Sequence, residues 1–412
     1  MKDMSVPIIE FTKKTNWETY RIGNLCDILT GFPFPGDKIK DDGTYLLMRG
    51  INITEGIVRH SDDIDRYYDG STIGLEKYFL HEGDLVIGLD GSKVGKNSAL
   101  VTAYESSSLL VQRVARLRNK DLDIIRLIQI AIKSSKFIKY IDEIKTSSAI
   151  PHISPEDIKS FRVSLPTASQ IRSLVVSYFQ SLDSLIQTTE RKIASLKQIK
   201  EASLQAMFPA EGETVPKVRF KGFEGEWNKI AFSSLYKKVT EKNDLSYGQD
   251  KIISVANMYF LDKDENSNSQ SDEDYMRSYN VMKLGDIAFE GHKSKNYSYG
   301  RFVENTIGDG IVSHVFTVFR PISQYNIFFW KYYINNENVM RNVLRRSTKA
   351  STMMNDLVIN DFLKETIRIP SYKEQQRIGD YFTFLDKQIS VQKQRHEKLK
   401  QIKSACLDAM FV

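Results

Sequence analysis

Residues 165–209 of this chain read LPTASQIRSLVVSYFQSLDSLIQTTERKIASLKQIKEASLQAMFP, and residues 369–412 read IPSYKEQQRIGDYFTFLDKQISVQKQRHEKLKQIKSACLDAMFV. The two stretches are copies of each other. The run LKQIK, for example, begins at Leu196 and again at Leu399, 203 positions later. Self-similarity at a fixed separation marks repeated structural units, so the sequence predicts a duplicated architecture.

Each copy predicts one long amphipathic helix. Both copies open with an apolar residue and a proline (Pro166 and Pro370), and then run without Gly or Pro, apart from Gly379, to a Met-Phe pair. A proline costs no hydrogen bond in the first turn of a helix, so we expect each proline to begin its helix. Apolar residues recur at spacings of three and four, which places them on one face. We expect about 38 residues, or roughly 57 Å, in each helix.

Two matching apolar faces on one chain are natural partners, and they predict an antiparallel coiled coil. One such face taken alone is equally typical of a core helix in a globular bundle. His396 takes the place of Ile193, and we interpret it as a polar residue of the seam rather than a ligand. The expected seam residues are Leu182, Ile186, Ile193, Leu196, Ile199, Leu385, Ile389, Leu399 and Ile402.

The segments ahead of the helices repeat more weakly. Trp17 and Trp227 each open a block, and Gly83-Asp84 and Gly285-Asp286 each precede a strand-like apolar run. Later come paired alternating stretches and then paired helical stretches, at 111–118 and 313–320 and at 122–144 and 327–344. This mixture predicts an irregular α+β domain in each half.

The repeat sets the expected domain boundaries. Residues 210–226, AEGETVPKVRFKGFEGE, are rich in Gly and charge and form a linker. The expected parts are a first domain at 1–165, a first helix at 166–209, this linker, a second domain at 227–369 and a second helix at 370–412.

Composition excludes several classes of protein. With 412 residues, 41% of them hydrophobic and 27% charged, the chain is an ordinary folded protein of about two domains. Its net charge of +6 only mildly favours a polyanionic partner, and its two distant cysteines suggest neither disulfides nor zinc. No run is long and apolar enough to span a membrane, and MKDMSVPIIEFTKK at residues 1–14 lacks the apolar core of a signal peptide. We therefore expect a cytoplasmic protein without a membrane segment.

Four features together are typical of one known family. They are the duplicated plan of domain and helix, the Leu-Pro or Ile-Pro helix entry, the linker PKVRFKGFEGEW (216–227), and the early phrases LLMRGINI (46–53) and ISVANMYF (253–260). In these, and over nearly its whole length, the chain resembles the specificity (S) subunits of type I DNA restriction-modification enzymes. The linker and helices are the specific part of the match.

The resemblance implies two target-recognition domains, each reading one half of a split DNA site, with the helices setting the distance between the halves. It implies double-stranded DNA, two methyltransferase (M) subunits and restriction/translocase (R) subunits as partners. The chemistry would lie on those other chains. The acidic run DKDENSNSQSDED (262–274) disfavours local DNA contact and predicts a solvated loop.

A DNA-reading domain needs cations at phosphates, and Arg or short polar side chains at base edges. The loop at 88–97 offers Lys93 and Lys96 among glycines that allow close backbone approach. The aligned loop of the second domain offers His292, Lys293, Lys295, Asn296, Tyr297 and Arg301. The alternative for both loops is a surface hairpin with solvated lysines.

The remaining DNA-binding candidates lie near strands or ahead of the long helices. Arg49 and Asn52, with Asn257 at the comparable place, suit base-edge hydrogen bonds or simply satisfy turns. Arg113 and His314 are placed at matching strand positions, where packing is the alternative. The expected phosphate contacts ahead of the helices are Lys145, Arg345, Arg346 and Lys349.

Patterns for catalysis are incomplete. Asp90 and Asn97 stand where a P-loop needs Gly and Ser or Thr. The nuclease-like triplet at 143–145 lacks a persuasive upstream acid, the six histidines show no metal-ligand spacing, and the Pro-Pro signature of an adenine methyltransferase is missing. We therefore expect no catalytic residue, metal or cofactor.

The leading hypothesis is a non-catalytic subunit that recognises a bipartite, asymmetric DNA sequence and positions methyltransferase and restriction subunits on it. Two rivals stay open: a stand-alone nuclease, and a duplicated protein-interaction scaffold with the coiled coil as spacer.

Overall fold

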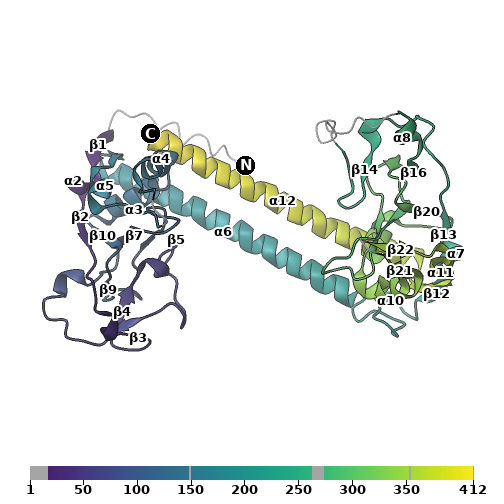
Figure 1. Cartoon of the computed structure of the whole chain (residues 1–412), viewed down its shortest axis with the longest axis horizontal. Helices are drawn as coiled ribbons and strands as arrows, with labels where there is room; N and C mark the ends of the chain where they lie inside the picture. Colours follow the sequence, from purple (N-terminus) through teal and green to yellow (C-terminus); the bar gives the residue numbers. More distant parts are fainter. Residues whose placement is uncertain (1–16, 148–149, 262–272, 352–353, 412) are drawn as a thin grey trace. The chain divides into compact units, whose positions relative to one another are not determined.

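The chain forms two compact units. The structure, a computed structural model, describes residues 17–147, 150–261, 273–351 and 354–411. Unit 1 comprises residues 1–189 and 394–412, and unit 2 comprises residues 190–393. Each unit therefore contains one of the predicted domains and a part of each long helix (Figure 1). The amino-terminal stretch 1–14, and residues 262–272 of the acidic run, lie outside the described residues.

The domain of unit 1 mixes short strands and helices. Its largest sheet has the strand order β2-β10-β7-β8-β5, beside a β3-β6-β4-β9 sheet and a β1-β11 pair. The strands are β1 (Trp17–Arg21), β2 (Asp27–Thr30), β3 (Ile39–Lys40), β4 (Tyr45–Met48), β5 (Glu55–Gly56), β6 (Tyr67–Tyr68), β7 (Leu85–Gly88), β8 (Ser98–Leu100), β9 (Leu109–Leu110), β10 (Val114–Arg118) and β11 (Arg162–Pro166). The helices are α2 (Ile22–Leu25), α3 (Leu122–Ala131), α4 (Ser135–Ile144) and α5 (Pro155–Ser160), with 3-10 turns η2 (Gly36–Lys38), η3 (Gly50–Asn52) and η4 (Glu76–Tyr78).

The domain of unit 2 repeats this plan. Its main sheet has the order β13-β20-β17-β18, and β12 pairs with β23. The strands are β12 (Asn228–Ala231), β13 (Tyr236–Lys238), β14 (Ile253–Ser254), β15 (Tyr259–Phe260), β16 (Asn280–Met282), β17 (Ile287–Glu290), β18 (Arg301–Glu304), β19 (Gly310–Val312), β20 (Thr317–Pro321), β21 (Thr348–Ala350), β22 (Asn355–Leu357) and β23 (Thr366–Ile369). The helices are α7 (Phe232–Leu235), α8 (Glu273–Arg277), α9 (Ile327–Tyr333), α10 (Glu337–Ser347) and α11 (Ile359–Lys364), with the 3-10 turn η5 (Gln249–Lys251).

The two domains share element order and strand pairing. β2, β10, β7 and β8 follow one another in the unit 1 sheet as β13, β20, β17 and β18 do in unit 2. In both, a strand that opens the domain pairs antiparallel with the strand that ends just before a long helix. The α+β fold class and the duplication predicted from the sequence are confirmed.

The repeated Gly-Asp pair has a structural role. Asp84 accepts a hydrogen bond from the His81 backbone N–H at 2.8 Å and pairs with Arg118 on the neighbouring strand at 2.7 Å. Asp286 pairs in the same way with Arg320 on its neighbouring strand, at 2.9 Å. Both aspartates are buried, so an unpaired carboxylate there would be costly. The motif fixes the frame of the sheet in each domain.

Each predicted helical stretch is two helices. Ser134 separates α3 from α4, and its hydroxyl caps α4 by accepting a hydrogen bond from the Phe137 N–H. Asn336 separates α9 from α10 and caps α10 through the Asn338 N–H. Ser and Asn favour the cap position because their side chains satisfy an otherwise unpaired backbone donor.

The long helices have the predicted length. α6 spans Ser169–Ala206 (38 residues) and α12 spans Tyr372–Met410 (39 residues). The predicted start was wrong: Pro166 is the last residue of β11, and Pro370 lies just after β23. Both prolines therefore end a strand, and the helix begins two or three residues later.

Hydrogen bonds join α6 to α12 in antiparallel order within each unit. In unit 1, Tyr178 contacts Cys406 at 3.6 Å, Asp183 pairs with Lys403, and Thr189 contacts His396 at 3.2 Å. In unit 2, Lys200 pairs with Asp386 at 2.5 Å and Ser203 contacts Tyr381 at 3.0 Å. The residues of these pairs are related by the repeat, because Asp183 and Lys200 match Asp386 and Lys403. The two helices lie side by side in Figure 1.

The seam follows an alternation of four and three residues from Leu182 to Lys200 and from Leu385 to Lys403, and Ile402 lies at its edge beside Lys403. Leu182, Leu385, Ile389 and Leu399 are buried, and Ile186, Ile193, Leu196 and Ile402 are half-buried. Ile199 is 45% exposed, so its assignment to the seam was wrong. The alternation passes from Leu196 to Lys200, which a helix face of period 3.5 requires. His396 is a polar seam residue as expected.

The Met-Phe pairs that end both copies complete the cores. Met207 and Phe208 are buried in the aromatic core of unit 2, where the Phe208 ring lies 5.0 Å from Tyr333 and 5.8 Å from Phe382. Met410 and Phe411 are buried in the core of unit 1. Each long helix therefore begins beside one domain and ends in the core of the other unit.

The linker is held at several points within unit 2. Arg219 pairs with the buried Glu374 of α12 at 2.7 Å, and the Val218 N–H bonds to the Ala206 carbonyl at 2.9 Å. The Phe220 ring contacts Tyr381, with ring centres 5.8 Å apart. This segment connects the end of α6 to the start of α12 as well as to the second domain.

We expect Phe208→Ala to destabilise unit 2 by about 3 kcal/mol or more, because it removes a buried ring and leaves a cavity. Hydrogen exchange measured along the whole chain tests this. Amides of α9 and α10 should exchange faster, while those of β7 and β10 in unit 1 stay protected. Gln205→Ala, at an exposed position of the same helix, is the control. Equal loss of protection in both units would contradict the assignment.

Candidate nucleic-acid interface

Four predicted segments come together in unit 1. The loop at 88–97 leaves β7, and its Leu89 N–H bonds to the Arg113 carbonyl at 2.9 Å, just before β10. The Gly91 N–H bonds to the Pro151 carbonyl at 3.0 Å, which joins the loop to the stretch ahead of α6. The turn after β4 is attached through β5, which pairs with β8. Segments far apart in sequence thus meet at one end of the sheet.

The corresponding segments meet in unit 2. The loop at 291–300 leaves β17, and the Asn355 N–H bonds to the Gly291 carbonyl at 2.8 Å. His292, Val315 and Asn355 line a common cavity of about 170 Å³. The Arg301 guanidinium donates to the Ala256 carbonyl at 2.9 Å, which attaches the segment that contains Asn257. We call this convergent region the loop cluster of each unit.

Acidic side chains neutralise the lysines of the unit 1 loop cluster. Lys93 pairs with Glu55 at 3.0 Å, while Lys96 and Lys145 both pair with Asp142, at 3.4 and 2.8 Å. The hydrogen bonds from Lys145 and then Lys96 lower the pKa of the Asp142 carboxyl. These pairs are largely exposed and worth little, so phosphates can compete for the lysines. Only the tertiary structure revealed Glu55 and Asp142 as partners.

The lysines of the unit 2 loop cluster, unlike those of unit 1, form no ion pair with another described residue. His292, Lys293, Lys295 and Asn296 are exposed on the β17–β18 loop, and Lys349 is exposed on β21. Their side chains make no hydrogen bond or ion pair with another described residue. The nearest acid along β21–β22 is Asp356, which lies opposite Lys349 in the strand register.

Some predicted residues of this loop serve the fold as well. Tyr297 donates to the Asn335 side chain at 2.6 Å, and Arg301 pairs with Glu290 at 2.6 Å. Asn257 is exposed, and it lines a cavity of about 640 Å³ together with Asn296, Tyr297 and Arg301. Asn257 and Asn296 are therefore the accessible members of this group.

Arg113 and His314 lie in turns rather than on strands, because β10 and β20 begin only at Val114 and Thr317. The turns are closed by the Val114 N–H to the Val111 carbonyl (3.2 Å) and by the Phe316 N–H to the Ser313 carbonyl (3.0 Å). This alignment places Arg113 opposite Val315, not His314, so the predicted match was one residue off. Val315, exposed by 59%, was missed by the sequence analysis, although aligning the two strands would have indicated it.

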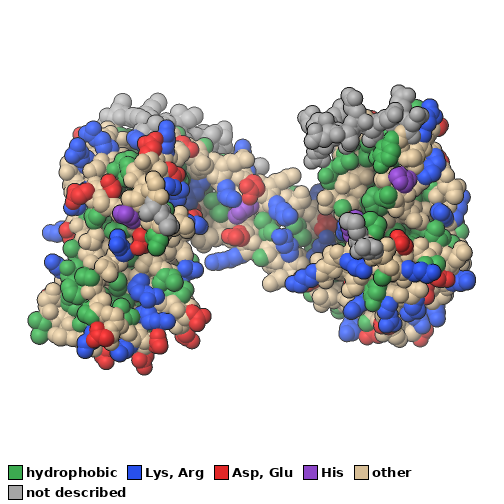
Figure 2. All heavy atoms as spheres, in the orientation of Figure 1, with side chains coloured by type: hydrophobic (Ala, Val, Ile, Leu, Met, Phe, Trp, Pro, Cys, Tyr) green, Lys and Arg blue, Asp and Glu red, His purple; other side chains and the backbone are tan. Residues whose placement is uncertain are grey.

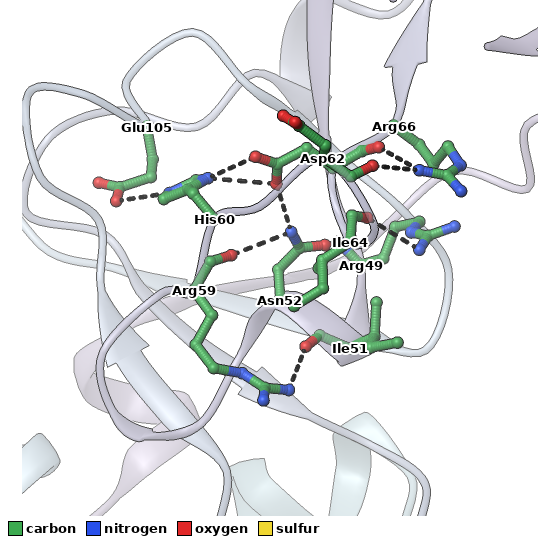
Figure 3. Close-up of polar contacts among 10 residues, drawn as sticks. Arg49, Ile51, Asn52, Arg59, His60, Asp62, Ile64, Arg66 and Glu105 are labelled. Atoms are coloured by element: carbon green, nitrogen blue, oxygen red, sulfur yellow. Dashed lines mark hydrogen bonds and ion pairs between the residues drawn. The ribbon is translucent and has the colours of Figure 1, made fainter. Parts of the chain in front are cut away.

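Arg49 and Asn52 hold a turn. Asn52 is 1% exposed, and its amide donates to the Arg59 carbonyl at 3.3 Å and to Asp65 at 2.9 Å. The Arg49 guanidinium donates to the Ile64 carbonyl at 3.1 Å, and burial together with nearby Arg66 lowers its pKa. Figure 3 shows these contacts. A side chain buried and paired in this way has no free edge for a base, so we leave Asn52 out of the interface.

The two arginines at the end of α10 differ in their contacts. Arg345 is exposed. Arg346 makes two hydrogen bonds to Glu365, at 2.9 and 2.7 Å, and these raise its pKa. Arg346 also lines a cavity with linker residues such as Glu211, and this cavity shares no lining residue with the cavity at His292. We therefore leave Arg346 out of the interface.

The surface carries mixed charge. Figure 2 shows Lys and Arg side chains spread among Asp and Glu on the visible face of each unit. Within the described parts of the chain, no cluster of three or more His, Cys, Asp or Glu has a geometry that could hold a metal. Across the same ranges, no helix is long and apolar enough to cross a lipid bilayer.

We expect Gly291→Ala to separate the β17–β18 loop from β22, because an added Cβ would lie 2.2 Å from the Asn355 carbonyl oxygen. Hydrogen exchange at the Asn355 amide should accelerate as its hydrogen bond to the Gly291 carbonyl breaks. Gly36→Ala is the control, since an added Cβ meets nothing within 4 Å there. An Asn355 amide that stays fully protected would show that the close approach of the two segments is not needed.

Comparison with known proteins identifies the family to which this chain is similar. A family model described as "Type I restriction modification DNA specificity domain" matches residues 14–198 and again 236–401. The type I restriction enzyme EcoAI specificity subunit of Escherichia coli is 29% identical over 198 residues, which are 47% of this chain but only 32% of that protein. The matched part thus spans about a third of the curated relative.

Solved structures show the same fold. The type I restriction-modification S subunit of M. genitalium superimposes with a TM-score of 0.57 at 13% identity, over 97% of both chains. A chain from a structure titled for complex assembly and conformational transition of the type I R-M system gives a TM-score of 0.51 at 15% identity, over 96% of this chain and 98% of that one. Because the family model matches both halves, this chain belongs to the type I restriction-modification DNA specificity family.

Proposed function

We propose that this chain is the DNA specificity subunit of a type I restriction-modification system. It binds a bipartite, asymmetric DNA target, and each domain reads one half through its loop cluster. The single observation that carries the proposal is the convergence, in both units, of the loop after β7 or β17, the turn before β10 or β20, and the stretch ahead of the long helix. A shared frame with differing exposed side chains suits base recognition on a common scaffold.

The positions of the exposed cations support contact with a phosphate backbone. Lys293, Lys295 and Lys349 need no internal pair to be broken, whereas Lys93 and Lys96 must exchange weak surface ion pairs for phosphates. Phosphate contacts fix the register, and side chains at base edges select the sequence.

The partners follow from the family. We propose that two methyltransferase subunits bind this chain, that restriction/translocase subunits join the full complex, and that the chain itself is non-catalytic and needs no cofactor. We propose the cytoplasm as its place of action. The paired helices α6 and α12 would set the spacing between the two half-sites.

Methylome sequencing of cells that carry this chain and its methyltransferase partner tests the proposal directly. One asymmetric motif, split by a fixed gap, is the expected result. The full chain should then bind that motif in preference to random DNA, with affinity that falls as salt rises. DNA cleavage or methylation by the chain alone, or a partner complex that modifies no bipartite motif, would reject it.

Removing one heptad from each helix should shorten the spacer and leave both half-sites unchanged. Deleting 189–195 together with 390–396 keeps the alternation of four and three residues on both helices and removes about 10.5 Å, or roughly three base pairs. Methylation motifs of the two proteins provide the measurement. Deleting only four residues from each helix breaks the alternation, and this control should lose activity. An unchanged gap after the heptad deletion would disprove the role of the helices.

Replacing Lys293 and Lys295 by Ala should weaken binding to all sequences alike. The slope of log affinity against log salt should become shallower by about 0.9 for each phosphate that is no longer neutralised. Arg346→Ala removes the same kind of charge outside the loop cluster and should leave the slope unchanged. A variant with reduced discrimination but an unaltered slope would assign these lysines to bases instead.

A further inference from the structure

We propose that Arg113 reads a guanine in the half of the target bound by unit 1, and that a strained backbone is retained to present it. This inference deepens the proposed function and rests on it. It assigns one base-reading side chain and the base that this side chain selects.

The backbone at Arg113 is suited to glycine. The Val114 N–H bonds to the Val111 carbonyl at 3.2 Å, which closes a four-residue turn with Arg113 at its third position. Its φ is +73°, in the left-handed region. Turns with positive φ at this position favour Gly, because a Cβ crowds the neighbouring carbonyl oxygen. The arginine therefore bears a steric cost that glycine would avoid.

Nothing within the described parts of the protein compensates for that cost. Of the three other non-glycine residues with positive φ, Leu245 and Met258 pack against hydrophobic core clusters, and Ser107 is exposed with its backbone N–H bonded to the Leu80 carbonyl at 2.8 Å. Arg113 is exposed as well, with a long charged side chain. Its guanidinium makes no hydrogen bond or ion pair with any residue in the described ranges. The side chain thus contributes no internal interaction that would explain its presence.

The turn is nevertheless held in place. The Arg113 carbonyl accepts the Leu89 N–H at 2.9 Å, and β10 follows at once with its strand pairing to β7. The fixed turn therefore sets where the side chain leaves the backbone, and the guanidinium at its end carries a planar set of donors. Guanine O6 and N7 match that geometry through two parallel hydrogen bonds. Phosphate oxygens can accept the same pair of bonds, so sequence discrimination and salt dependence distinguish the two ligands.

The counterpart position in unit 2 strengthens the assignment. The turn from Ser313 to Phe316 is closed in the same way and places Val315, 59% exposed, where unit 1 has Arg113. The ion pairs that fix the two sheets, Asp84–Arg118 and Asp286–Arg320, are retained. Turns at the same place on the frame, left-handed at Arg113 but not at Val315, therefore present side chains of different chemistry. That is the pattern expected if the position selects a base and the two half-sites differ.

Arg113→Gly tests the backbone strain, through stability, and the base recognition, through binding, in one variant. The full chain should become more stable, with Tm higher by about 2–4 °C, because glycine relieves the backbone. In binding assays of the complex with its methyltransferase subunits, discrimination at one G·C pair should fall about tenfold or more, while the other positions stay unaffected. Arg113→Lys keeps the charge but should also lose that discrimination. Val315→Gly, at the unstrained counterpart, is the control and should give no rise in Tm.

The other outcomes are equally definite. A Tm that falls in Arg113→Gly would show that the arginine stabilises the fold, and overturn the inference. Equal weakening on all sequences with a shallower salt slope would make Arg113 a phosphate-binding residue, and also overturn it. Unchanged discrimination at every base pair, by a complex that still binds its motif, would overturn this inference alone. A wild-type complex with no preferred motif would overturn the proposed function with it.

Discussion

The antiparallel packing of α6 on α12 is the constraint on which the rest of the structure depends. Each unit contains residues from distant parts of the chain, because the helix that starts beside one domain ends in the core of the other unit. Phe208 and Phe411 occupy equivalent places in those cores. Removing the end of either helix would therefore open the core of the unit in which that helix ends as well as the helix seam.

The repeat makes the pairing self-consistent. In an antiparallel pair of repeated helices, a contact between two residues recurs between their two repeat equivalents. Asp183–Lys403 and Asp386–Lys200 are related in this way. The seam is not purely apolar: Thr189 contacts His396. A polar layer of this kind costs stability but fixes register, because any slip would leave its groups unpaired among apolar neighbours. Fixed register matters for a protein whose proposed role is to measure distance.

The buried frame and the exposed loops are separated within each domain. Buried Asp84 and Asp286 fix neighbouring strands through Arg118 and Arg320, whereas the loops and turns that leave the same strands carry exposed Arg, Lys, Asn and Val. This division lets the exposed residues change without loss of the sheet. It also explains why the two domains correspond so closely in strand order while their loop sequences differ.

The sequence by itself determined the long helices, their pairing and the α+β class, because helix periodicity and duplication are local or repeated signals. It also indicated the loop after each Gly-Asp pair. It could not tell that Asn52 is buried, that Ile199 lies off the seam, or that Arg113 aligns with Val315. These three features depend on contacts that form only in the folded chain. The Asn52 amide donates to Asp65, and the helix seam continues through Lys200 instead of Ile199. A backbone hydrogen bond closes the turn that contains Val315. Such meetings between remote segments were decided only in the tertiary structure.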